Sequence, residues 1–159
     1  MANNIGVFST NLADALNTIG SFKSLIDGSV VNLYYASVIP DSPDPALVGA
    51  TLLAQLCKGD ADVTNDLDWD ATASPGAMLK PTADTWSTPT GTGVIASGTP
   101  NFFIINTQIS DDNSADASGT NYRILGLCGP DGSYGMQVGA LTAGQPLSIN
   151  SATLRIGKA

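Results

Sequence analysis

The chain has 159 residues, and 43% of them are hydrophobic, which is enough apolar material for the core of one domain and excludes a disordered chain. It contains no histidine and all 14 acidic residues are aspartate, so neither a Ser-His-Asp triad nor a Cys-His pair can form, and we predict that it is not an enzyme. The net charge of −8 argues against nucleic acid and anionic lipid as direct partners, because such partners require a basic surface.

Residues 10–26 carry the one convincing helical pattern. Apolar residues recur at spacings of three and four, and a Gly-Ser pair interrupts them, which predicts a helix near 10–19 and a short turn near 22–26. Thr10 or Asn11 can serve as N-cap. The stripe can cover the sheet of its own domain or dock on a neighbouring subunit. Its members are Leu12, Ala15, Leu16, Ile19, Phe22, Leu25 and Ile26.

From residue 29 onward the apolar residues recur with a period of two, which predicts strands. The run Phe-Phe-Ile-Ile at 102–105 is the most apolar of these segments, and we expect a central strand there that is buried on both faces. The segment Ala50–Cys57 fits a strand better than a helical turn. The predicted strands cover residues 29–36, 50–57, 77–80, 94–97, 101–108, 122–128, 136–138, 146–149 and 152–156.

Short strands with closely spaced turn signals are typical of an antiparallel sandwich, of jelly-roll or Ig-like kind. We therefore expect a mainly β fold with a single antiparallel β-sandwich and a short N-terminal helical segment. In this prediction residues 1–28 form the N-terminal arm and helical segment, and residues 29–159 form the sandwich domain.

The segment 58–76 is acidic and raises the question of calcium. Counted from Asp60, the EF-hand positions that require Gly and Glu hold Asn65 and Ala71, so that template fails. We favour a solvated loop and hairpin over a structural cation, and we predict no metal site. The aspartates of this Asp60–Asp70 cluster are Asp60, Asp62, Asp66, Asp68 and Asp70, and a weaker cluster with the same interpretation holds Asp111, Asp112 and Asp116.

Cys57 and Cys128 end apolar strand-like runs, which favours two buried thiols, although a disulfide in an oxidising exterior is the alternative. Nucleotide-binding and metalloenzyme motifs are missing from the sequence, and we predict no cofactor. Two of the aspartates could act as a glycosidase pair, but nothing marks which two. The residues Trp69, Trp86, Tyr34, Tyr35, Tyr122 and Tyr134 could line a carbohydrate site, although core and interface packing is favoured.

Several stretches, taken in order, resemble a family of small structural proteins of tailed bacteriophages and prophages. The resemblance covers most of residues 20–156. Each stretch is weak by itself, and their order is moderately specific. The stretches are Gly20–Gly28, Val30–Tyr35, Ile39–Gly49, Thr51–Leu56, Lys80–Ser87, Gly93–Phe103, Tyr122–Leu127 and Leu141–Ile149.

The resemblance implies a virion component with a β-sandwich fold and without catalytic residues. We expect a head decoration or cement protein that is assembled in the host cytoplasm, with a neck, collar, tail or fibre component, including one that binds carbohydrate or a receptor, as the alternative. Its partners would be the major capsid protein and further copies of itself in a closed homo-oligomer such as a trimer. Membranes are not expected as partners, because the sequence has no apolar span and no signal-peptide pattern. Besides the loops 39–49 and 58–76, the candidate interface residues are Ile5, Val7, Phe8, Leu12 and Leu16.

Overall fold

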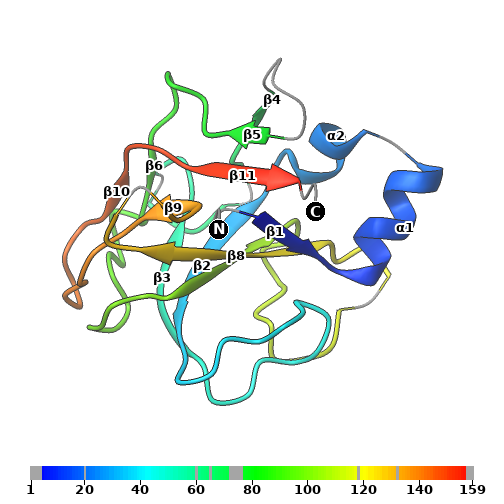
Figure 1. Ribbon diagram of the computed structural model, residues 1–159. Coiled ribbons are helices and arrows are strands. Elements are labelled where there is room, and N and C mark those ends of the chain that lie inside the picture. Colours follow the sequence, from blue (N-terminus) through cyan, green and yellow to red (C-terminus); the bar gives the residue numbers. More distant parts are fainter. Residues whose placement is uncertain are drawn as a thin grey trace.

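The computed structural model confirms a mainly β fold with two short helices near the N-terminus (Figure 1). The structure describes residues 5–19, 21–59, 61–64, 66–71, 77–117, 119–131 and 133–156. The elements in chain order are β1 (Ile5–Phe8), α1 (Thr10–Thr18), α2 (Phe22–Ile26), β2 (Val30–Tyr35), β3 (Thr51–Leu56), β4 (Asp70–Ala71), β5 (Ala77–Leu79), β6 (Trp86–Ser87), β7 (Phe102–Asn106), β8 (Arg123–Gly129), β9 (Met136–Gln137), β10 (Ser148–Ile149) and β11 (Thr153–Ile156).

The strands of the described chain form a nine-stranded sheet and a two-stranded sheet. The large sheet has the order β3-β2-β7-β8-β1-β11-β5-β4, with β9 added beside β8, and the small sheet pairs β10 with β6. Most pairs are antiparallel, as expected, but β1 runs parallel to β11 and β9 runs parallel to β8. Purely antiparallel pairing is therefore a wrong prediction at these two places.

The N-terminal strand joins the two halves of the large sheet. Ile5 pairs with Arg155 of β11, whereas Val7 pairs with Leu125 of β8. Strand β1, which lies within the N-terminal segment 1–28, is consequently part of the large sheet. The sequence did not indicate this pairing, because strand partners distant in the chain are set by tertiary packing.

The large sheet has apolar side chains on both faces of its central strand. Phe103 and Ile105 belong to the main core, while Phe102 and Ile104 belong to a second, smaller core on the opposite face. All five residues of β7 are buried. This confirms the prediction of a central strand buried on both faces.

Helices α1 and α2 cover the main core with the predicted apolar stripe. Leu12 and Ile26 are fully buried, and Leu16 packs against the same core, so the stripe covers its own domain. Ile19 is the exception and is 72% exposed. The N-cap is Ser9 and not Thr10 or Asn11, because the chain is still extended at Ser9, where it leaves β1 and donates its N–H to the carbonyl oxygen of Arg123 at 2.9 Å.

Two further predictions need correction. Residues 94–97 form no strand but an irregular segment, in which the N–H groups of Ile95 and Ala96 both donate to the carbonyl oxygen of Leu53. The acidic segment is also less solvated than expected, because Leu67 and Trp69 point into the core between outward aspartates. Asp60 and Asn65 lie outside the described residues.

The two cysteines are free and buried, which confirms the first of the two alternatives. Burial raises the pKa of the Cys128 thiol to about 12. Such a thiol is almost entirely protonated at neutral pH and is a poor nucleophile.

Candidate interaction surface

Two long loops pack together over the smaller core. The first connects β2 to β3 through residues 36–50, and the second connects β7 to β8 through residues 107–122; we call the surface formed by residues 36–50 and 107–117 the loop face. Both loops lie in the lower half of Figure 1. The N–H of Leu47 donates to the carbonyl oxygen of Asn113 at 2.8 Å, and the N–H of Ala117 donates to that of Asp44 at 2.7 Å.

A buried ion pair lies beneath the loop face. The side chains of Arg123 and Asp111 are 1% and 4% exposed, and the guanidinium Nη2 stands 2.6 Å from Asp111 Oδ1. Nε also donates to Asp111 Oδ2, at 2.7 Å, which makes the pair bidentate. The remaining donors reach the carbonyl oxygens of Pro43, Asp44 and Ala115. The side chain of Arg123 in β8 therefore forms hydrogen bonds to both loops and fixes their position on the sheet.

Polar side chains of β2 and β7 extend this network. Tyr34 donates its hydroxyl to Asn113 Oδ1 at 2.8 Å, and Asn106 Nδ2 donates to the same oxygen at 3.0 Å. Asn113 has a φ of 62°, in the left-handed region that asparagine tolerates better than most residues. Burial is the main cause that raises the pKa of Tyr34 well above its usual value. The loop conformation is thus anchored to the sheet by satisfied buried hydrogen bonds.

Neither the pair nor the network was predicted, because Asp111 was interpreted as part of a solvated cluster. In the structure Asp111 is buried, with 7% of the whole residue exposed. One signal in the sequence was available: the period of two along β8 places Arg123 on the same face as Leu125 and Leu127. A cation on an apolar strand face requires a buried partner.

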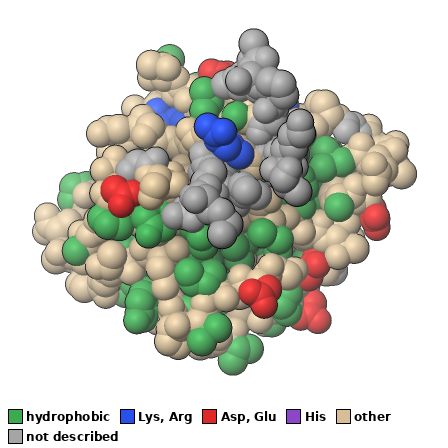
Figure 2. All heavy atoms as spheres, viewed as in Figure 1, with side chains coloured by type: hydrophobic (Ala, Val, Ile, Leu, Met, Phe, Trp, Pro, Cys, Tyr) green, Lys and Arg blue, Asp and Glu red, His purple; other side chains and the backbone are tan. Residues whose placement is uncertain are grey.

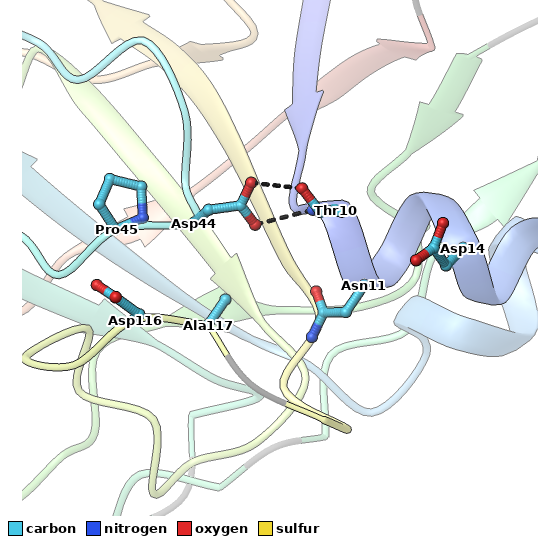
Figure 3. A pocket seen from close by; sticks show the side chains of 7 residues that line it. All are labelled: Thr10, Asn11, Asp14, Asp44, Pro45, Asp116 and Ala117. Carbon is cyan, nitrogen blue, oxygen red and sulfur yellow. Dashed lines mark hydrogen bonds between the residues drawn. The ribbon is translucent and has the colours of Figure 1, made fainter.

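The start of α1 is attached to the same loops (Figure 3). The carboxylate of Asp44 accepts hydrogen bonds from the N–H and from the hydroxyl of Thr10, both at 2.8 Å. Burial raises the pKa of Asp44, but the hydrogen bonds from Thr10 and Ser42 outweigh it and hold the pKa below its usual value. Asp14 and Asp116 face the same hollow, whose volume is about 500 Å³.

An apolar groove of about 260 Å³ adjoins this hollow on the same loop. Val38 and Val48 line it, and they are 81% and 93% exposed. Tyr35, just before the groove in the chain, is 48% exposed. Isolated exposed apolar residues are common. Here, however, two almost fully exposed valines line one groove, on a loop that the buried hydrogen bonds of Arg123 hold in place. Together they form an apolar patch that a partner can cover.

The structure also places the candidate interface residues of the N-terminal segment. Val7 is 38% exposed. Phe8 stacks on Phe22 with ring centroids 5.1 Å apart, and Leu16 packs on the main core. Leu12 is fully buried in that core, so it does not reach a partner in this fold. The side chain of Ile5 lies outside the described residues.

Lys58 forms an ion pair and a backbone hydrogen bond with the acidic segment around Asp66. The Nζ of Lys58 lies 2.6 Å from a carboxylate oxygen of Asp68 and 3.4 Å from one of Asp84. The backbone N–H of Lys58 donates to Asp66. Within the described ranges, cysteine and aspartate side chains nowhere gather in a group of three or more that could hold a metal ion.

Neither helix of the described chain is long and apolar enough to span a membrane. Comparisons with protein-family models, with curated proteins and with solved structures gave no match.

Proposed function

We propose that this protein is a structural component of a bacteriophage virion, a head decoration or cement protein that coats or stabilises the capsid through protein–protein contacts. The order of sequence stretches that resembles phage structural proteins supports the proposal. One structural observation supports this mode of action. An exposed apolar groove lies on the loop 36–50, which Arg123 holds in place by hydrogen bonds. In this proposal the protein acts through a contact surface.

The rigid base of the groove supports a binding role. Leu47 of this loop packs on the smaller core, and Arg123 donates to the carbonyl oxygens of Pro43 and Asp44. A loop held in this way loses little conformational freedom when a partner covers it, which lowers the entropic cost of association. Val38 and Val48 are then available as the apolar contacts.

We propose the β-sandwich as the finer description of the fold. In support, the main core takes side chains from both halves of the large sheet, for example Leu33 of β2 and Ile105 of β7 from one half, and Met78 of β5 and Leu154 of β11 from the other. Side chains of two facing layers pack in this way in a sandwich.

The alternative of a carbohydrate-binding module loses support from the tryptophans. Trp69 and Trp86 are fully buried and pack edge to face, with centroids 4.7 Å apart. These rings belong to the core and cannot stack on a sugar without unfolding.

Mass spectrometry of purified particles of the phage that encodes the chain tests the proposal. We expect the protein in a fixed number of copies per particle, and in capsids separated from tails. Its absence from washed particles would contradict a virion role. Recovery only with separated tails would contradict decoration of the head.

The role of the groove is tested with the double variant V38S/V48S. Both side chains are almost fully exposed, so we expect an unchanged unfolding midpoint but at least ~10-fold weaker binding to particles that lack the protein. Ile19→Ser is the control, because it removes an apolar side chain that is 72% exposed, against 81% and 93% for the two valines, from the C-cap of α1. Equal binding by the double variant and by wild type would exclude the groove as the contact.

A further inference from the structure

Charge is unevenly distributed over the molecule. Residues 24–57 and 81–122 contain no lysine or arginine; both loops of the loop face lie within these ranges, and Arg123, which follows them, is buried against Asp111. The exposed charges of the loop face are consequently negative, at Asp41, Asp112 and Asp116, and Asp14 of α1 adjoins them. In Figure 2 the visible lysine and arginine side chains lie in the upper part of the view, whereas aspartates appear in both its upper and its lower parts.

The apolar groove and the acidic hollow are lined by consecutive residues of one loop. Asp44 and Pro45 line the hollow, and Ala46, Leu47 and Val48 line the groove. A single partner surface can therefore cover both at once. Pro40 also lines the groove, and the exposed Asp41 follows it, so residues that line the groove have an aspartate as chain neighbour at this end of the loop too.

We infer that the loop face binds a partner protein whose contact surface is an apolar ridge flanked by lysine or arginine side chains. This inference rests on the proposed function and names the chemistry of the partner. The ridge fills the groove at Val38 and Val48, while its cations face Asp41, Asp14 and Asp116. Opposite charges at the rim increase the rate of encounter and fix the orientation, while the apolar centre supplies most of the affinity.

A second copy of this chain fits the loop face poorly. Two loop faces brought together would place aspartates opposite aspartates. Among the described cations outside the loop face, Lys23 pairs with Asp27, Lys58 pairs with Asp68, and Lys80 donates to carbonyl oxygens of Pro81 and Asp84. Arg155 of β11 is then the one exposed cation of the described residues outside these contacts, which is too few to match the aspartates of the loop face. The complementary surface therefore belongs to another protein.

The test uses the full chain and phage particles that lack it as the probe. We compare the triple variant D14N/D41N/D116N with the control triple D62N/D70N/D131N, which neutralises three exposed aspartates elsewhere. Both variants carry a net charge of −5, from −8 plus 3, so a difference between them reports position and not total charge. Bound copies are counted by sedimentation and quantitative mass spectrometry from low to high NaCl concentration.

We expect the loop-face triple to bind the particles about tenfold more weakly than wild type at low salt, and the control to bind like wild type. The difference should shrink at high salt, because ions screen exposed charges. Equal binding by both triples would overturn the inference and leave the virion role intact, whereas failure of wild type to bind would count against the proposed function itself.

Analytical ultracentrifugation of the protein alone addresses the competing occupant. If wild type forms an oligomer that V38S/V48S dissociates, the groove binds a second copy and the inference is wrong. An oligomeric state unchanged by V38S/V48S supports a different partner.

Discussion

Breaking the buried ion pair between Arg123 and Asp111 should cost more stability than any change on the loop surface. Asp111→Ala leaves a guanidinium that is 1% exposed without its carboxylate. Removing one partner of a buried pair typically costs ~3–5 kcal/mol, because the remaining charge has lost its water and its counter-ion. For a chain of this size that corresponds to a fall of about 6–20 °C in Tm.

A double-mutant cycle separates the pair from its surroundings. Arg123→Met removes the charge but leaves the carbonyl oxygens of Pro43, Asp44 and Ala115 without their donor. Because the variant D111A/R123M buries no unpaired charge, we expect it to be destabilised by less than the sum of the single variants, with a coupling of at least ~1 kcal/mol.

Urea unfolding at pH 7, followed by tryptophan fluorescence, measures all four proteins of the cycle. Asp112→Ala is the control, because it removes an exposed neighbouring carboxylate that accepts hydrogen bonds from Ser114 and takes no part in the ion pair. We expect this control to unfold close to wild type. A loss below ~1 kcal/mol for Asp111→Ala, or additive losses in the cycle, would refute the account of the network.

Three further outcomes are expected. Gly126→Ala should destabilise the protein by ~1–3 kcal/mol in urea unfolding, because its Cβ would stand 2.3 Å from Cζ of the buried Phe103; unchanged stability would mean that the ring moves aside. Asp44 has a pKa lowered in the folded state, so the stability that it contributes is present above its ordinary pKa of 3.8 and is lost as the pH falls below it; Asp44→Asn should therefore weaken the acid dependence of the unfolding midpoint, and an identical dependence would contradict this. The thiol of Cys128 should react with a disulfide reagent only after unfolding, because its pKa is raised to about 12 by burial, and rapid labelling of the native protein would show that the thiol is accessible.

Local patterns in the sequence sufficed for most elements. The spacing of Leu12, Leu16 and Ile26 predicted both helices and the face that they bury, and the run at 102–105 predicted a central strand. These predictions succeed because helix and strand periodicities depend on neighbouring residues alone. The loop 39–49 remains a predicted contact region.

Features that depend on distant residues required the tertiary structure. The N-terminal strand contacts β8 and β11, more than a hundred residues away, and nothing local to Ile5–Phe8 indicates those partners. The same holds for the N-cap at Ser9, which follows from where β1 ends.

The charged residues show most clearly which properties follow from the sequence and which require the tertiary structure. The sequence by itself determined that the protein is acidic and that its cations avoid residues 24–57 and 81–122. Only the tertiary structure decided that Asp111 lies beneath the surface and neutralises Arg123, while Asp41 and Asp116 remain exposed beside an apolar groove. Burial arises from packing between segments that are far apart in the chain, so identical aspartates in one stretch receive opposite environments.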